Sequence, residues 1–208
     1  TVATNDKDYV APEPAELPEG PAEVLDGFVA VVRFEAMVNP GMGQHVEASI
    51  ERAKTEGAQL LLIELDTPGG LVTTTQDIVQ AILSASLPVV VYVSPSGAHA
   101  ASAGTFITLA AHVAAMAPAT RIGAAHPVTG GGKDPEESGG KHMARKIEND
   151  LLAMVEGIAK ARNRNVEWAK DAVRDSVSAD AEKAAASGKR RAKARRGSVL
   201  KAGCEPSL

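Results

Sequence analysis

The sequence predicts an α/β domain whose core is a mostly parallel β-sheet. Short apolar runs of strand length alternate along the chain with segments in which apolar residues recur at helical spacing, as in successive βαβ units. Residues 78–120 contain no Asp, Glu, Lys or Arg. Prolines at positions 88, 95 and 118 divide this stretch into pieces that are too short to span a membrane. We therefore interpret it as buried strands and a helix of a soluble core.

The composition agrees with one globular domain and disfavours some classes of partner. The chain has 208 residues, of which 44% are hydrophobic and 23% charged, enough to form a sizeable core. Aromatic residues make up only 3%, so stacking on nucleic-acid bases is not expected, and no nucleic-acid partner is predicted. The single cysteine, Cys204, excludes an internal disulfide. The histidines at positions 45, 99, 112 and 142 show no metal-ligand spacing, so neither a metal nor another cofactor is predicted.

The two ends of the chain differ from its middle. Residues 1–27 hold four prolines, seven acidic residues and one lysine, which predicts a flexible acidic arm. Residues 189–208 hold seven Lys or Arg residues and one Glu, so residues 1–188 carry 15 basic and 25 acidic side chains, a net charge of −10. We expect this basic tail to be disordered. The globular domain is thus predicted to span residues 28–188.

The domain begins with a strand, a helix and a second strand. Residues 28–34 are rich in β-branched and aromatic side chains and precede the turn Asn39-Pro40-Gly41, which indicates the first strand. Residues 44–56 place apolar side chains at helical spacing among charges, which predicts a helix. Residues 60–65 form an almost continuous apolar run, which predicts a buried strand.

The next elements repeat this alternation. After the turn at residues 66–70, Ile78 and Ile82 recur at helical spacing and indicate a second helix. Residues 88–93 predict a third buried strand, and a turn of small residues then leads into a helix predicted for residues 100–111.

The last part of the domain contains its best-marked helix. Two short strands are predicted at 113–116 and 121–125, followed by a glycine-rich surface loop at 129–140. A helix is predicted from about residue 141 to residue 161, and a further amphipathic segment contains Trp168. The apolar residues of the long helix follow one another at steps of four, four, three and four: Met143, Ile147, Leu151, Met154 and Ile158.

Two glycine-rich turns follow buried strands, at residues 66–70 and 94–104. Both therefore lie at the carboxyl ends of strands, where α/β sheets bind ligands. Gly69 and Gly70 lack a Cβ atom, which allows backbone N–H groups to approach a ligand closely, as an oxyanion hole requires. A plain tight turn is the alternative interpretation.

Ser102 lies between small residues at the start of a predicted helix. Free backbone N–H groups and the helix dipole would stabilise an oxyanion at this point. The alternative is an ordinary N-cap serine. Because no Gly-x-Ser-x-Gly sequence is present, the α/β-hydrolase fold is not indicated.

Several motifs in residues 28–188 occur as a set. They are Leu62-Ile63-Glu64-Leu65-Asp66-Thr67-Pro68-Gly69-Gly70, Ala101-Ser102-Ala103-Gly104-Thr105, Met116-Ala117-Pro118, Ile122-Gly123-Ala124-Ala125-His126-Pro127-Val128, Lys146-Ile147-Glu148-Asn149-Asp150 and Arg162-Asn163-Arg164-Asn165. In combination they resemble the ClpP/crotonase-like serine proteases, and most closely the NfeD family of membrane-associated proteases. The resemblance implies a ClpP/crotonase-like fold built from repeated ββα and βαβ units.

The resemblance also implies the catalytic residues. Ser102 would be the nucleophile and Lys146 its general base, and the backbone N–H groups of Gly70 and Ala103 would form the oxyanion hole. A Ser–Lys dyad needs a neutral amine, which partial desolvation favours, and Lys146 lies beside the apolar stripe of its helix. Without the resemblance, a surface lysine would be the better interpretation. Lys133 and Lys141 rank lower because their glycine-rich surroundings are expected to be hydrated.

His126 is the rival base, since ClpP uses a Ser-His-Asp triad. His126 lies 24 residues after Ser102, close to the spacing in ClpP. It stands five residues after Arg121, however, whereas the ClpP-like register has four, and a shift of one residue along a strand turns the side chain to the other face. No acidic residue is clearly placed to orient it. We therefore favour the interpretation that His126 lines the cleft, as Gly69 would.

By resemblance, the chain would be a serine endopeptidase that cleaves apolar segments of membrane-associated proteins, with stomatin- or prohibitin-like partners. The family implies a homodimer and, for a full-length protein, attachment to a membrane on its extracytoplasmic side, although this chain contains no predicted transmembrane segment. Two alternatives are a crotonase-like acyl-CoA hydratase or isomerase and an inactive scaffold that binds a membrane partner. The chain departs from the family after residue 188, where a basic tail replaces an apolar strand and puts the last β element in doubt.

Overall fold

The structure is a computed structural model that describes residues 27–128 and 135–187. Its main sheet has four strands, β1 (Val29–Glu35), β2 (Leu60–Asp66), β3 (Val89–Val93) and β5 (Val113–Met116), in the order β1-β2-β3-β5. All neighbouring pairs are parallel. This confirms the predicted α/β class and the mostly parallel sheet. Three predicted segments lie outside the described residues: the arm at 1–27, of which only Gly27 is described, residues 129–134 of the loop, and the tail at 189–208.

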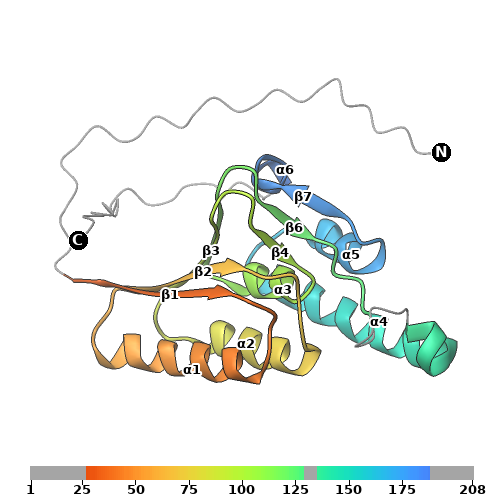
Figure 1. The fold of residues 1–208 in the computed structure, drawn as a ribbon, viewed down its shortest axis with the longest axis horizontal. Coiled ribbons are helices and arrows are strands. Elements are labelled where there is room, and N and C mark those ends of the chain that lie inside the picture. The colour runs from red at the N-terminus through yellow and green to blue at the C-terminus, as the bar shows by residue number, and fades with distance from the viewer. Residues whose placement is uncertain (1–26, 129–134, 188–208) are drawn as a thin grey trace. The chain divides into compact units, whose positions relative to one another are not determined.

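Two helices cover one face of this sheet. Helices α1 (Pro40–Thr55) and α2 (Val72–Ser84) lie side by side below β1 and β2 in Figure 1. The core lies between helices and sheet, because alternate residues of the central strands are buried there. The helix predicted for residues 44–56 begins earlier, since the Asn39 side chain accepts a hydrogen bond from the Met42 N–H and Pro40 occupies the first turn. The predicted turn at Asn39 is thus a helix cap.

A second, smaller sheet consists of β4 (His99–Ala101), β6 (Arg121–Gly123) and β7 (Ser178–Asp180). Strands β4 and β6 are parallel, and β7 is antiparallel to β6. The helix predicted to start at residue 100 is therefore wrong at its beginning: residues 99–101 form a strand, and α3 spans Ala103–Ala110. Small residues give no periodic signal that separates a short strand from a helix. Strand β7 was not predicted at all.

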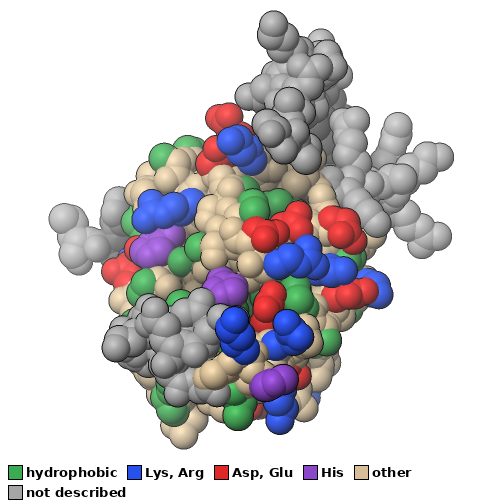
Figure 2. Space-filling model, turned by 90° about the vertical axis from the view of Figure 1, so that its right-hand side faces the viewer, with side chains coloured by type: hydrophobic (Ala, Val, Ile, Leu, Met, Phe, Trp, Pro, Cys, Tyr) green, Lys and Arg blue, Asp and Glu red, His purple; other side chains and the backbone are tan. Residues whose placement is uncertain are grey.

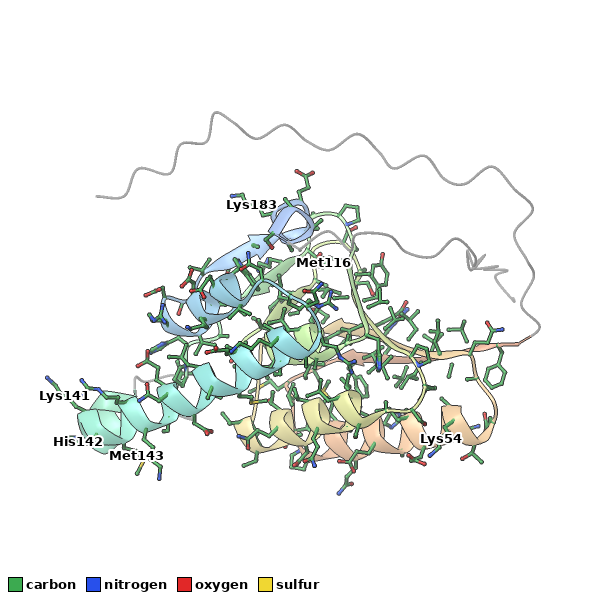
Figure 3. The ribbon with its side chains drawn as sticks, turned by 180° about the vertical axis from the view of Figure 1, so that it is seen from behind. Lys54, Met116, Lys141, His142, Met143 and Lys183 are labelled. Carbon is green, nitrogen blue, oxygen red and sulfur yellow. The ribbon has the colours of Figure 1, made fainter. Side chains whose placement is uncertain are left out.

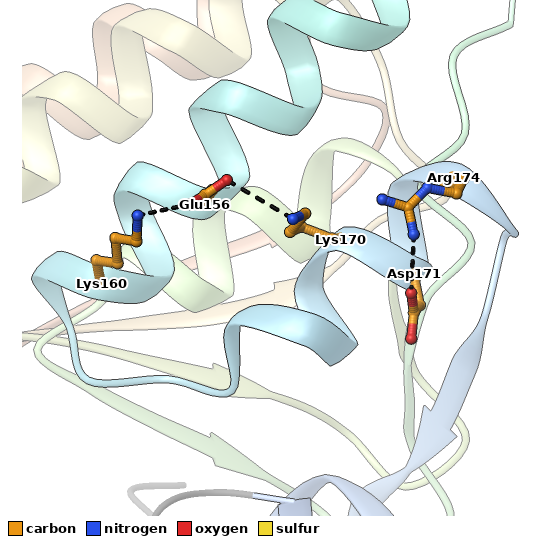
Figure 4. A network of polar contacts seen from close by, with 5 residues as sticks. All are labelled: Glu156, Lys160, Lys170, Asp171 and Arg174. Carbon is orange, nitrogen blue, oxygen red and sulfur yellow. Dashed lines mark hydrogen bonds and ion pairs between the residues drawn. The ribbon is translucent and has the colours of Figure 1, made fainter.

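The long helix α4 (Pro135–Ala161) contains a break at Gly140, whose φ of 76° is non-helical. The regular helix therefore begins at Lys141, as predicted, while the predicted loop at 129–140 is wrong for residues 135–139, which are helical. The amphipathic segment around Trp168 is confirmed as α5 (Val166–Arg174), and α6 (Ala181–Ser187) follows β7. Figure 4 shows Glu156 of α4 paired with Lys170 of α5 at 3.8 Å, which joins the two helices.

The arginines after α4 fix the ends of other helices. The Arg162 guanidinium donates hydrogen bonds to the carbonyl oxygens of Ala110 at 2.7 Å and Ile82 at 3.1 Å, near the C-termini of α3 and α2. Arg164 donates to the Ala111 carbonyl oxygen at 3.0 Å. The carbonyl groups at helix C-termini lack partners within the helix, and cations stabilise them. The Arg162-Asn163-Arg164-Asn165 motif therefore has a structural role here.

The stability of this region should depend on pH through His112. Its Nδ1 accepts a hydrogen bond from the Val89 N–H at 3.1 Å, and burial, together with Arg162, lowers the pKa of the imidazole. The unfolded chain then binds a proton at His112 more readily than the folded chain does. The contribution of neutral His112 to the free energy of unfolding is therefore present above about pH 6.5 and is lost as the pH falls through the folded-state pKa. His112→Asn, whose amide oxygen can accept the same hydrogen bond without titrating, should show a flatter free energy of unfolding between pH 7.5 and 5.5 in urea titrations. Equal slopes in both proteins would contradict this role.

Among the helices of residues 27–128 and 135–187, none combines the length with the apolar character that crossing a bilayer requires.

Candidate active site

The turn after β2 brings backbone groups close to a neighbouring segment. Gly69 has a φ of +127°, which favours glycine, and its carbonyl oxygen accepts a hydrogen bond from the Val38 N–H at 2.8 Å. A Cβ atom on Gly70 would lie 2.1 Å from the Val38 carbonyl oxygen, so only glycine fits there. Leu71 N–H donates to that same oxygen at 3.0 Å. The paired glycines are therefore more than a tight turn, because they hold the turn against Val38.

Ser102 lies in the turn between β4 and α3 with an unusual backbone conformation, φ 51° and ψ −113°. Its side chain makes no capping hydrogen bond to α3, so the N-cap interpretation is not supported. Such conformations cost free energy and persist where the surroundings enforce them, often at functional sites. The Ser102 N–H donates to the Gly123 carbonyl oxygen at 3.0 Å, which holds the turn against β6.

The two turns meet at Ser102. A Cβ atom on Gly69 would lie 2.8 Å from the Ser102 Cβ and 3.2 Å from its Oγ. This contact follows from strand pairing, since Thr67 N–H donates to the His99 carbonyl oxygen and Ala101 N–H donates to that of Thr67, at 2.8 and 3.0 Å. The pairing extends β2 onto β4 and places Gly69 beside the serine.

Two backbone donors near Ser102 remain free within the described part of the chain. Neither the Gly70 N–H nor the Ala103 N–H donates a hydrogen bond to another described residue. Ala103 is the first residue of α3, where the helix dipole favours negative charge. Unpaired N–H groups beside a hydroxyl can stabilise a developing oxyanion.

The Thr105 hydroxyl joins the segments around the serine. Thr105 is fully buried, and its Oγ1 lies 2.9 Å from the Gly123 carbonyl oxygen and 3.0 Å from that of Ala100. It also accepts a hydrogen bond from the Gly123 N–H at 3.1 Å. Since the Gly123 carbonyl also holds the Ser102 N–H, this hydroxyl supports the turn that carries the serine. The sequence analysis missed this residue, although it belongs to the Ala101–Thr105 motif.

Removing that hydroxyl should weaken both the fold and the positioning of Ser102. Thr105→Val keeps the shape of the side chain but leaves the buried Gly123 N–H without an acceptor, which should cost about 1–3 kcal/mol of unfolding free energy. The rate at which a serine-directed reagent modifies Ser102 should fall at least tenfold, because the turn that orients Ser102 loosens. Thr105→Ser, which keeps the hydroxyl, is the matched control. Urea unfolding and the modification rate check the prediction, and a Thr105→Val protein whose Ser102 reacts as fast as that of Thr105→Ser would contradict it.

Lys146 is placed on α4, which packs against α3. Its side chain is exposed and makes no hydrogen bond or ion pair with another described residue, so the structure does not bring it into contact with Ser102. Its position beside the apolar stripe permitted burial, but the side chain is not buried, and Met143 on the same edge is 51% exposed. Lys141 lies with His142 and Met143 at the far end of α4 (Figure 3), and Lys133 lies outside the described residues.

His126 follows β6 and is half-buried. Its Nδ1 lies 3.0 Å from the carbonyl oxygen of Val173 in α5. A carbonyl can only accept, so Nδ1 carries the proton in this contact. No acidic side chain of the described chain forms an ion pair with His126. Because a Ser-His-Asp triad orients its histidine with a carboxylate, the lack of such a partner among the described residues favours the lining role.

Asp66 and His99 form a further pair of titratable residues, and His99 lies three positions before Ser102. The Asp66 carboxylate is 3.0 Å from both the Nδ1 and the backbone nitrogen of His99. This double contact joins the end of β2 to the start of β4. The sequence analysis missed the pair, which only strand pairing reveals. No cluster of three or more possible metal ligands occurs within the described ranges. On the face shown in Figure 2, histidines lie among basic and acidic side chains.

The chain is similar in sequence to known proteins. Residues 28–191 match the family model described as the NfeD1b N-terminal domain. Over 157 residues, 76% of the chain, it is 34% identical to the membrane-bound protease PH1510 of Pyrococcus horikoshii, of which it covers 35%. Over 141 residues, 68% of the chain, it is 32% identical to the membrane protein NfeD1b of Bacillus subtilis, of which it covers 30%. The chain thus spans about a third of the length of these relatives.

Solved structures show the same fold. A serine-to-alanine mutant of the 1510-N membrane-bound stomatin-specific protease superposes with a TM-score of 0.71 at 33% identity, covering 79% of this chain and 78% of that one. A lysine-to-alanine mutant of the same protease, solved with a substrate peptide, gives 0.70 at 33% identity over 78% and 73%. ClpP1 of Listeria monocytogenes gives 0.58 at 20% identity over 76% and 86%, a likeness of fold alone. The expected ClpP-like fold is confirmed.

Proposed function

The chain belongs to the family of NfeD1b N-terminal domains, and on this premise we propose that residues 28–188 form a serine endopeptidase domain with Ser102 as nucleophile. The observation that carries the proposal is the conformation of Ser102, held by β6 and the Gly69 turn beside two free backbone N–H groups. The named relatives support it, because two of the similar structures are proteases altered at a serine or a lysine.

In the proposed reaction, the Ser102 Oγ attacks the carbonyl carbon of the scissile peptide bond and transfers its proton to the neutral amine of Lys146. The N–H groups of Gly70 and Ala103 stabilise the oxyanion of the tetrahedral intermediate. The protonated lysine then gives its proton to the leaving amine, which leaves an acyl-enzyme on Ser102. A water molecule, deprotonated by the same lysine, attacks the ester and releases the acid and the serine. The reaction requires the Lys146 side chain to extend from α4 to the Ser102 hydroxyl when substrate binds.

We infer that the substrates are apolar extended segments. Next to the Gly70 turn, Met37 and Leu71 expose 62% and 52% of their surface, and the hydrogen bond between Leu71 N–H and the Val38 carbonyl oxygen keeps their backbones adjacent. Exposed apolar side chains beside free backbone donors suit an apolar peptide. One of the similar structures is named as a membrane protease specific for a stomatin homologue from Pyrococcus horikoshii. We extend this to a stomatin- or prohibitin-like membrane protein as partner, and to membrane association of a full-length protein on its extracytoplasmic side.

A fluorophosphonate probe tests the proposal. It should label the chain once, and peptide mass spectrometry should place the label on Ser102, because only an activated serine attacks phosphorus at a useful rate. An apolar peptide should be cleaved, and prior labelling should stop the cleavage. A crotonase-like hydratase or an inactive scaffold would remain unlabelled, so an unlabelled, correctly folded chain overturns the proposal.

A further inference from the structure

The proposed site draws its residues from two different sheets (Figure 1). Gly70 follows β2 of the main sheet, whereas Ser102 and Ala103 follow β4 of the smaller sheet. Where the described ends of β2 and β4 meet, they share one isolated bridge, between Thr67 and Ala100, instead of a ladder. One bridge fixes a point of contact but not the angle between two segments. The alignment of the two halves of the site therefore depends on whatever else joins β2 to β4.

The Asp66 side chain supplies these additional contacts. Its Oδ1 accepts a hydrogen bond from the backbone N–H of His99 at 3.0 Å and lies 3.0 Å from the imidazole Nδ1 of the same residue. The next residue, Thr67, donates its N–H to the His99 carbonyl oxygen at 2.8 Å. His99 is thus held against the end of β2 by both of its backbone groups and by its ring. We call the pair Asp66 and His99 the carboxylate–histidine clamp.

The clamp lies three residues before the site along both segments. His99 is three positions before Ser102, and Asp66 is three positions before Gly69, where a Cβ atom would lie 2.8 Å from the Ser102 Cβ. Between Asp66 and Gly69, the fully buried Thr67 links the segments further, because its Oγ1 accepts a hydrogen bond from the Gly69 N–H at 3.2 Å. A shift at the clamp is therefore transmitted to the contact between Gly69 and Ser102.

The surroundings of the clamp favour a local effect over a global one. The side chains of Asp66 and His99 are 32% and 28% exposed, and neither forms an ion pair with any other described side chain. Ion pairs that remain partly in contact with water contribute little to the overall stability of a protein. A hydrogen bond to a carboxylate is nevertheless stronger than one to a neutral acceptor, so it can hold a short segment in one position.

We propose that Asp66 is a positioning residue that acts through His99. By fixing the start of β4 against the end of β2, its carboxylate sets the position of the Gly70 N–H relative to the Ser102 hydroxyl and the Ala103 N–H. In this role neither side chain of the clamp touches the reacting atoms. The proposal rests on the proposed function, because nucleophile and oxyanion donors must act on the same carbonyl group, and a misplacement of about 1 Å can cost about a hundredfold in rate.

The rate at which a fluorophosphonate modifies Ser102 in the full chain tests the proposal. Asp66→Ala removes both contacts to His99 and should lower the second-order rate constant at least about thirtyfold. Asp66→Asn keeps an oxygen that can accept the His99 N–H and should restore the rate to within about fivefold of the parent chain. Asp77→Ala is the matched control and should react like the parent, since Asp77 is an exposed carboxylate of α2 that forms no ion pair with a described residue.

A double variant tests whether the carboxylate acts through the histidine. His99→Ala keeps the hydrogen bond from the backbone N–H to Asp66 but loses the ring contact, so its rate should lie between those of the parent chain and Asp66→Ala. Asp66→Ala combined with His99→Ala should react no more slowly than Asp66→Ala alone, because residues that share one contact are not additive.

Two further measurements separate positioning from a loss of fold. In the background of Ser102→Ala, Asp66→Ala should change the affinity for an apolar peptide by less than about threefold, since substrate binding and transition-state alignment are different requirements. Amide hydrogen exchange of Asp66→Ala should become faster in residues 99–104, while β1 and α1 keep the exchange rates of the parent chain.

Three outcomes overturn the proposal. The first is that Asp66→Ala reacts as fast as Asp77→Ala. The second is that Asp66→Asn reacts as slowly as Asp66→Ala. The third is that slow modification of Asp66→Ala comes with an equal loss of peptide affinity and with faster exchange throughout the domain, which would assign a structural role only. A parent chain that is not modified at Ser102 refutes the proposed function, and this role with it, before any variant is compared, so the two failures are distinguishable.

Discussion

Ser102→Ala is expected to abolish peptide hydrolysis while leaving the fold intact. The substitution removes the attacking oxygen, and loss of a catalytic nucleophile typically lowers kcat by about four to six orders of magnitude. The fold should tolerate it, because the Ser102 side chain makes no capping hydrogen bond and the hydrogen bond that holds the turn comes from its backbone N–H. Turnover of an apolar peptide and the thermal unfolding midpoint are the two measurements.

Ser96→Ala is the matched control for this experiment. Ser96 is an exposed serine in the turn before β4, six positions from Ser102, and it makes no contact that the proposed reaction uses. It should keep the activity of the parent chain. If Ser102→Ala retains parental turnover with an unchanged unfolding midpoint, the nucleophile is another residue and the proposed site is wrong.

The second large effect is expected at the general base. Lys146→Ala should be as inactive as Ser102→Ala, and the double variant no worse, since residues that act as one unit are not additive. His126→Ala should keep most of the activity, because no acidic side chain of the described chain pairs with His126 to complete a Ser-His-Asp triad. Lys141→Ala, an exposed lysine on the same helix, is the control for loss of charge.

The pH profile separates the two candidate bases independently. A lysine acts as a base only when neutral, and ordinary lysines keep their proton up to about pH 10. With a lysine base, kcat/KM should therefore climb toward alkaline pH, whereas a histidine base should reach a plateau near pH 7. An active Lys146→Ala together with an inactive His126→Ala would assign a ClpP-type triad and refute the Ser–Lys dyad.

The sequence alone determined the elements whose signal is local. The strands of the main sheet follow from continuous apolar runs such as residues 60–65, which become β2 with alternate residues buried. The regular part of α4 follows from an apolar stripe that repeats every three to four residues. The Gly69-Gly70 turn was identifiable because glycine is required where a Cβ atom would collide with another backbone. Each of these signals reports the surroundings of residues within a few positions of one another.

Only the tertiary structure decided how these segments meet. The pairing of β4 with Thr67 places Gly69 beside Ser102. Strand β7 pairs with β6, which is distant in sequence, and its three residues are too few to give a periodic signal. The Thr105 hydrogen bonds, the Asp66–His99 pair and the exposure of Lys146 likewise depend on contacts between distant segments. Periodicity records that a side chain is apolar, and only the assembled fold determines what it contacts.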